Sequence, residues 1–150
     1  MKKILITTFA LLVLGSVTAN AKKSKTVDPR VNAVFAVDFV GAENVQWSKD
    51  ADFYYANFTL DGKDVIAVYD AQNTEYIGFL RQIDADHLPS SIRLTLAREF
   101  EGYAAIGPVA EIGNPDSDAY ILTIQNDRQL IKIKADTNGN VSILNKLKKT

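Results

Sequence analysis

Residues 53–69 read FYYANFTLDGKDVIAVY. Two runs rich in aromatic and β-branched residues, 53–60 and 65–69, stand on either side of Asp61-Gly62. Such runs favour β-strands, and an Asp-Gly pair between two of them favours a tight turn. This stretch therefore predicts a β-hairpin, and it makes antiparallel pairing the basis of the fold.

Similar strand-like segments, bounded by turn residues, precede and follow this hairpin. They cover residues 45–47, 76–83, 103–112, 120–125, 129–134 and 141–147. Two other segments have apolar residues at helical spacing. One follows Asp28-Pro29, a capping residue and a proline typical of a helix start, and the other follows Leu88-Pro89. The chain is therefore predicted to contain both helices and strands.

The order of the predicted elements occurs twice. A helix and about four strands in residues 29–84 precede a helix and about four strands in residues 88–150. The two strand pairs match if the turn is allowed one residue less: Tyr54, Ala56, Phe58, Ile66 and Val68 then align with Tyr120, Leu122, Ile124, Ile131 and Ile133. We therefore predict an α+β fold made by tandem duplication of a helix plus about four antiparallel strands, with both helices packed on one face of an extended antiparallel sheet.

Residues 1–21 have the three parts of a secretory signal peptide. Two lysines precede an apolar run over residues 4–14, and Ala19-Asn20-Ala21 is a small-x-small cleavage site. The run is shorter than the roughly 20 residues of a membrane span. We predict cleavage near Ala21 and a periplasmic or secreted location with no membrane insertion afterwards. A flexible segment over 22–28 is expected to precede a single domain over 29–150.

Charge and cysteine content narrow the class of protein further. The chain has no cysteine, so neither a disulfide nor a lipid-attachment cysteine is available. Its formal charge is -1, and loss of the two lysines in residues 1–21 would leave 15 of 17 basic residues against 18 acidic ones. This balance argues against binding to nucleic acid or to an anionic membrane, which requires a concentrated basic surface.

Several short stretches resemble the PepSY-like family of exported bacterial proteins, also described as β-lactamase-inhibitor-like (BLIP-like). They are Phe39-Val40-Gly41-Ala42 followed by Val45-Gln46-Trp47, Tyr54-Tyr55-Ala56-Asn57-Phe58, Leu88-Pro89 and Phe100-Glu101-Gly102-Tyr103. The resemblance covers nearly all of residues 22–150. It implies tandem α-plus-antiparallel-sheet units, a periplasmic location and an inhibitory or protein-binding role, and it implies no catalytic residue. Val40 and Asn73 depart from the family pattern, which favours proline and glycine there, and the departures concern local geometry only.

Side chains that could carry catalysis or bind a metal are few. His87 is the single histidine and lies near Asp84 and Asp86, but a metal site would need a further group from elsewhere in the fold. A serine triad would have to pair His87 with Ser90 or Ser91, and no Gly-x-Ser-x-Gly sequence is present. We interpret this segment as a polar loop.

The paired acidic residues also have a simpler interpretation. Residues 136–140 carry oxygen side chains as a calcium loop does, but the closing glutamate of such a loop is missing. Asp50 with Asp52 and Asp116 with Asp118 fall in predicted turns, where aspartate favours local backbone bonds. We therefore predict no catalytic residue, no bound metal, no cofactor and no enzymatic activity.

Alternation along the predicted strands sorts side chains onto two sides of the sheet. Ile131 and Ile133 are expected in the core, so that Lys132 and Lys134 face solvent. The same parity in the first repeat buries Tyr54, Ala56, Phe58, Ile66, Val68, Ile77 and Phe79. It turns outward Phe53, Tyr55, Asn57, Ala67, Tyr69 and Tyr76. Trp47, the only tryptophan, is expected to pack under the first helix.

The outward side of the first repeat is therefore unusually aromatic. We predict a binding patch on the open sheet face, formed by Phe53, Tyr55, Tyr69 and Tyr76 with Lys132 and Lys134 at its rim. An open antiparallel face is normally polar, and aromatic side chains dominate interface hot spots. The alternative is that the sheet curves, or that the repeats fold on each other, and the aromatic side chains belong partly to the core.

These observations predict a protein-binding module whose partner is another exported protein, with inhibition of a periplasmic or secreted enzyme as one form of that role. A second hypothesis is a periplasmic carrier of a small ligand or peptide, with a pocket between helices and sheet. The sequence predicts neither the identity of the partner nor the oligomeric state.

Overall fold

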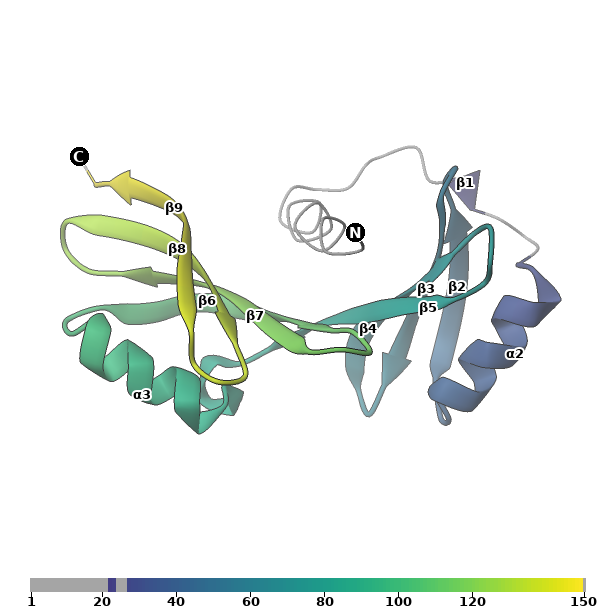
Figure 1. The fold of residues 1–150 in the computed structure, drawn as a ribbon, viewed down its shortest axis with the longest axis horizontal. Helices are drawn as coiled ribbons and strands as arrows, with labels where there is room; N and C mark the ends of the chain where they lie inside the picture. Colours follow the sequence, from purple (N-terminus) through teal and green to yellow (C-terminus); the bar gives the residue numbers. More distant parts are fainter. Residues whose placement is uncertain (1–21, 24–26, 150) are drawn as a thin grey trace.

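The computed structural model describes residues 22–23 and 27–149. Nine strands in these residues form one antiparallel sheet, in which each strand pairs with the next one along the chain (Figure 1). The strands are β1 Lys22–Lys23, β2 Glu43–Lys49, β3 Phe53–Leu60, β4 Lys63–Asp70, β5 Tyr76–Ile83, β6 Ala104–Gly113, β7 Asp118–Gln125, β8 Gln129–Asp136 and β9 Val141–Lys148. The helices of this part of the chain are α2 Pro29–Asp38, α3 Ser90–Glu99 and the short 3-10 helix η1 Ala85–His87.

The fold is α+β, but the predicted architecture is wrong. The prediction was a tandem duplication of a helix plus about four antiparallel strands, with both helices packed on one face of an extended sheet. The structure does not divide into two repeated units: it is one continuous sheet, because β5 pairs directly with β6 from Phe79↔Gly113 to Ile83↔Val109. The two α-helices of the described residues lie at opposite ends of the long axis (Figure 1). Residue spacing within a segment predicts a helix or a strand, but it does not predict which distant strands pair with each other.

The β3–β4 hairpin forms as predicted. Leu60 pairs with Lys63 across the two-residue turn, in which Asp61 (φ 50) and Gly62 (φ 73) both have positive φ. A turn of this kind matches the right-handed twist of the strands that it joins, and glycine takes up the second position without strain.

Helix α2 covers the end of the sheet formed by β2 to β5. The Asp28 carboxylate caps the helix by accepting from the Arg30 backbone N–H at 2.8 Å. Phe35 then packs edge-on against Phe58, with ring centroids 5.0 Å apart, and against Trp47 at 5.3 Å. The predicted place of Trp47 beneath the first helix is thus confirmed.

Helix α3 covers the other end of the sheet. Its Ile92 is fully buried in a cluster with alternate residues of β7 and β8, namely Tyr120, Leu122, Ile124, Ile131, Ile133 and Ala135. The Ser91 hydroxyl donates to the Thr137 carbonyl at 2.7 Å and thereby joins the start of α3 to the β8–β9 turn. The predicted burial of the paired isoleucines in β8 is confirmed.

The predicted side-chain directions in β4 are wrong. Phe58 pairs with Val65 and Tyr54 pairs with Tyr69, so Val65, Ala67 and Tyr69 face α2. Ile66 and Val68, which were predicted to face the helix, point to the opposite side. The prediction had allowed one residue less in one turn, and a shift of one residue exchanges the two faces of a strand.

The predicted signal peptide of residues 1–21 lies outside the described residues. Of the predicted flexible segment, residues 22–23 form β1, paired with Lys49 and Ser48 of β2, and residues 24–26 are not described. None of the helices described is long and apolar enough to cross a membrane.

Candidate binding surface

A third apolar cluster lies at the centre of the sheet and contains no helix residue. It consists of Leu80 of β5, Ala110 and Ile112 of β6, and Ile121 of β7. Leu80 pairs with Ile112, and Ala110 pairs with Ile121. Tyr120 and Leu122, on either side of Ile121, both belong to the α3 cluster. Since successive side chains of a strand alternate, the central cluster must point away from α3. We call this side of β3 to β8, directed away from the described helices, the open face; its central cluster is itself buried, with 3–7% of each residue exposed.

Phe53 and Tyr55 occupy the open face at its β3 end. They alternate with Tyr54 and Ala56, which belong to the α2 cluster, and their ring centroids are 6.3 Å apart. The Tyr55 hydroxyl donates to Asp50 Oδ2 at 2.7 Å, and Asp50 Oδ1 accepts from the backbone N–H of Phe53 at 2.8 Å. The β2–β3 turn therefore holds the Tyr55 ring in a defined position.

The contact between Tyr55 and Asp50 shifts the pKa of both groups. Burial, followed by the hydrogen bond to the Asp50 carboxylate, raises the pKa of Tyr55. Burial acts to raise the pKa of Asp50 as well, but the hydrogen bonds from Tyr55, Asp52 and Phe53 outweigh it, and the pKa of Asp50 is lowered. Tyr55 is therefore a neutral hydrogen-bonded phenol at physiological pH.

Lys132 and Lys134 lie on the open face at its β8 end. Both side chains are half-buried, and they alternate with Ile131, Ile133 and Ala135 of the α3 cluster. Lys134 pairs with Ile121, so this lysine stands directly beside the central apolar cluster. The ion pairs among the described residues involve neither lysine, so both ammonium groups can meet a carboxylate of a partner.

Tyr69 and Tyr76 do not reach the open face, and their predicted outward direction is wrong. The Tyr69 side chain is 0% exposed and packs between Trp47 and Tyr76, at ring-centroid distances of 6.0 and 5.5 Å. Tyr76 is half-buried, and its ring lies 6.0 Å from that of Phe39 at the end of α2. Burial raises the pKa of Tyr76 to about 12. Both tyrosines are thus part of the α2 core.

The sequence-based prediction missed the central cluster, although a signal for it exists. Residues 119–122 read AYIL and residues 109–112 read VAEI. Each of these strands therefore has apolar residues at both odd and even positions, which point to the two faces of the sheet. A strand with apolar residues on both sides is expected to bury both. The structure thus places an apolar centre between the predicted aromatic end and the predicted lysine end.

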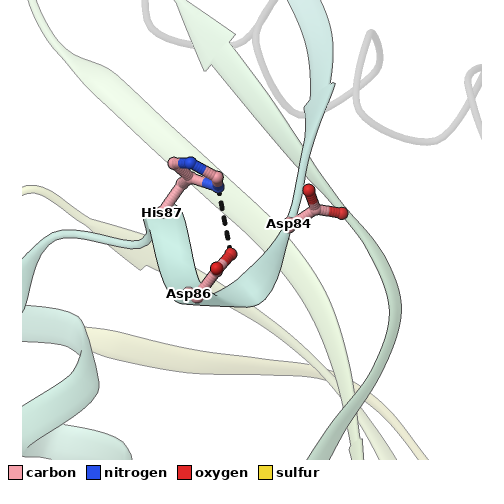
Figure 2. Close-up of side chains that lie close together, drawn as sticks. All are labelled: Asp84, Asp86 and His87. Atoms are coloured by element: carbon pink, nitrogen blue, oxygen red, sulfur yellow. Dashed lines mark ion pairs between the residues drawn. The ribbon is translucent and has the colours of Figure 1, made fainter.

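Asp84, Asp86 and His87 come together at η1, but all three are exposed (Figure 2). His87 Nδ1 lies 3.0 Å from Asp86 Oδ1, and the potential ligand atoms of the three residues lie within 4.8 Å of one another. Exposed polar side chains on one short turn are also what a solvated loop contains. The geometry agrees with the interpretation of this segment as a polar loop.

The other residues considered for chemistry are engaged locally. Ser91 donates to a backbone carbonyl of the β8–β9 turn and is not directed at His87. Asp136 accepts from the backbone N–H groups of Asn138 at 2.9 Å and Asn140 at 3.0 Å. Its carboxylate therefore stabilises a hairpin turn, as the sequence indicated.

The space between α2 and the sheet is filled with aromatic side chains. The Phe39 ring, for example, lies 5.4 Å from Phe35 and 4.8 Å from Phe58. The Tyr69 hydroxyl is buried there without a hydrogen-bond partner among the described residues. Because core side chains occupy this region, the arrangement favours the open face over the helix–sheet space as a binding surface.

The geometry defines a class of protein: an α+β chain with one long antiparallel sheet, a helix over each end and an open face with an apolar centre. Three solved structures with this fold come from Bacteroides species. A BLIP-like protein from Bacteroides fragilis has a TM-score of 0.64 and 14% identity over 84% of this chain and 90% of that one. A DUF2874 family protein from Bacteroides uniformis has a TM-score of 0.64 and 19% identity over 82% and 90% of the two chains.

The third structure is a candidate periplasmic protein from Bacteroides eggerthii, with a TM-score of 0.63 and 16% identity over 82% of this chain and 89% of that one. None of the three is described as an enzyme. No family model and no curated protein matches the sequence. At these identities the likeness shows that the chain shares a fold with BLIP-like proteins.

Proposed function

We propose that this chain is an exported module that binds another exported protein on the open face of its sheet. Inhibition of a periplasmic or secreted enzyme is one form that such binding takes. The fold shared with a BLIP-like protein and with a candidate periplasmic protein supports the proposal. The composition supports it as well, since the chain carries neither a cysteine nor a basic excess.

One observation carries the proposal: the apolar cluster of Leu80, Ala110, Ile112 and Ile121 lies on the side of the sheet that no described helix covers, and its residues are 3–7% exposed, so the contact area around it comes from the flanking side chains. A solvated face of an antiparallel sheet is normally polar. Protein interfaces, by contrast, have an apolar core with aromatic anchors and a polar rim. Phe53 and Tyr55 at one end of the open face and Lys132 and Lys134 at the other fit these roles.

The test is to block the open face with one bulky side chain. Gln82 is exposed on β5 and pairs with Ala110 of the central cluster, so Gln82→Trp would place an indole over the proposed contact. The chain from Lys22 onward serves as bait for a periplasmic extract, and captured proteins are quantified by mass spectrometry. We expect Gln82→Trp to reduce capture of the specific partner at least tenfold.

A matched control places the same side chain elsewhere. Arg93 is exposed on α3, and Arg93→Trp adds an equal indole on the helix side of the molecule. This variant is expected to capture the partner as the wild type does. Equal capture by both variants, with both as thermally stable as the wild type, would refute docking on the open face.

A further inference from the structure

Strand β9 leaves one edge of the sheet without a neighbour among the described residues. It runs for eight residues, and the ladder with β8 continues beyond it, since the Lys149 backbone N–H donates to the Arg128 carbonyl at 2.9 Å. The opposite edge strand, β1, has only two residues. A long edge presents a row of backbone donors and acceptors to a further strand. At one position of this edge the Lys146 backbone N–H donates to Asn145 Oδ1 at 2.7 Å, and an added strand would have to displace that side chain. Backbone geometry alone therefore makes β9 the better docking edge.

The side chains of β9 are exposed and unusually apolar for an edge. Ile143 is 54% exposed, Leu144 45% and Leu147 54%, and these are three of the large hydrophobic residues that the described chain leaves in solvent. Proteins commonly protect an edge with lysines, and this one carries Lys146 and Lys148. The edge is thus shielded from copies of itself by charge, while its apolar side chains remain open to a partner of opposite charge.

The register gives these lysines a defined direction. Lys146 pairs with Ile131 and Lys148 with Gln129, so the two ammonium groups lie on the same side of the sheet. Leu147, between them, pairs with Leu130 and points to the other side. The ion pairs of the described residues include neither lysine. A strand added here would meet two positive charges on one side and a leucine on the other.

We infer that β9 binds an extended acidic segment of another protein as a tenth antiparallel strand. Alternate Glu or Asp side chains of that segment lie opposite Lys146 and Lys148, and an apolar side chain between them lies opposite Leu147. Main-chain hydrogen bonds supply the affinity and the charge pattern supplies the selection. This edge is separate from the open face, so the inference does not depend on the proposed function.

A second copy of this chain is a poorer occupant of the edge. Between residues 141 and 149, β9 and its extension contain three lysines and no acidic residue. Pairing of two such strands therefore provides no opposite charges, and a parallel arrangement would oppose like charges directly. An acidic strand neutralises the same lysines.

The probe is a fluorescein-labelled hexapeptide of alternating valine and glutamate with blocked ends. Its binding to the chain from Lys22 onward is measured by fluorescence anisotropy. We expect saturable binding that weakens at least tenfold with Lys146→Glu/Lys148→Glu. The matched control, Lys63→Glu/Arg93→Glu, makes the same change in net charge at exposed positions of β4 and α3 and should stay within twofold of wild type.

A second peptide separates strand pairing from simple charge attraction. The same sequence with alternate backbone nitrogens methylated keeps every charge and loses the donors of one edge, and we expect it to bind at least tenfold more weakly. Equal binding of the two peptides, or equal binding to the Lys146→Glu/Lys148→Glu protein, would overturn the inference. A dimer in light scattering that the peptide dissociates would overturn it too, because the edge would then belong to a second copy. Gln82→Trp should leave peptide binding unchanged. Failure of strand pairing at β9 can therefore be distinguished from failure of docking on the open face.

Discussion

Two buried tyrosines show that the contribution of a hydroxyl to stability depends on whether it has a hydrogen-bond partner. Tyr120 is 5% exposed, and its hydroxyl donates to Glu111 Oε1 at 3.2 Å, while Arg81 donates to the other carboxylate oxygen. Tyr69 is 0% exposed, and its hydroxyl has no partner in the described part of the chain. A buried polar group without a hydrogen bond costs free energy of folding, whereas a satisfied one contributes to it.

We therefore predict opposite results for the same substitution at these two sites. Tyr69→Phe removes an unpaired hydroxyl and should raise the free energy of unfolding by about 1 kcal/mol. Tyr120→Phe leaves the buried Glu111 carboxylate with one donor fewer and should lower it by about 1 kcal/mol. Urea titration of both variants checks the pair, and a fall of similar size at Tyr69 would mean that its hydroxyl is hydrogen-bonded.

Asp50 makes the stability of the β2–β3 turn dependent on pH. Its pKa in the folded chain lies below the ordinary value of 3.8 because Tyr55 and two backbone N–H groups bind the charged form, in opposition to the effect of burial. A lowered pKa stabilises the fold at pH values above the unfolded value, and this contribution is lost as the pH falls through the folded value.

Asp50→Asn should therefore lower the melting temperature at neutral pH and have little effect in strong acid. The difference from wild type should be constant above about pH 5 and shrink as the pH falls through the lowered pKa of folded Asp50. Thermal denaturation across this range measures it. A difference that stays constant down to the lowest pH would show that the charge of Asp50 contributes nothing.

At the scale of elements, turn chemistry could be predicted and strand register only in part. Asp61-Gly62 identified the β3–β4 hairpin, and the alternating isoleucines of β8 identified the core under α3. Tyr69 was assigned to the wrong side because the match between strand pairs assumed a shorter turn, and the β-strand period of two converts a one-residue error into a reversed face. The aromatic end of the open face was therefore predicted with two tyrosines that belong to the core.

The β5–β6 pair was not predictable from local pattern. The segment between these strands contains η1 and α3, and no sequence signal states that the strands on either side of it are neighbours. Phe79 and Gly113 pair directly at this junction, and a Cβ atom at Gly113 would overlap the Phe79 ring. Close packing at this point needs glycine because it has no side chain.

Gly113→Ala should accordingly destabilise the protein by about 1–3 kcal/mol, the usual effect of overpacking a filled site. Phe79→Leu in the same chain shortens the opposing side chain and should recover part of the loss. Denaturant titration of the two single variants and the double variant gives the coupling between the sites. Additive effects, with no recovery, would show that the two residues do not compete for the same space.

At the scale of the molecule, three apolar clusters share one sheet. The α2 cluster and the α3 cluster lie at its ends, and the central cluster of the open face lies on the strands that join them. Strands β4 to β7 are paired in succession, with one irregularity in the β4–β5 pair and one in the β6–β7 pair, so a disturbance in the middle should reach both ends. We therefore do not expect the two ends of the sheet to unfold independently.

The whole chain should therefore unfold in one transition. Trp47 fluorescence reports on the α2 end, whereas far-ultraviolet circular dichroism reports on all strands, and their urea transitions should coincide. Ile112→Ala, in the central cluster, should lower both midpoints together, by a loss of about 2–5 kcal/mol. A fluorescence transition at lower urea than the dichroism transition would show that the α2 end unfolds by itself.

The order of the strands has a consequence for how the chain reaches this structure. Each strand pairs with the next one along the chain, so the sheet grows by successive short loop closures, apart from the connection that contains α2 and the one that contains η1 and α3. Folding rates fall as the sequence separation of contacting residues increases. A chain connected in this way can add strands in their order along the chain, and it should fold faster than an antiparallel sheet of equal size whose neighbouring strands are distant in the chain.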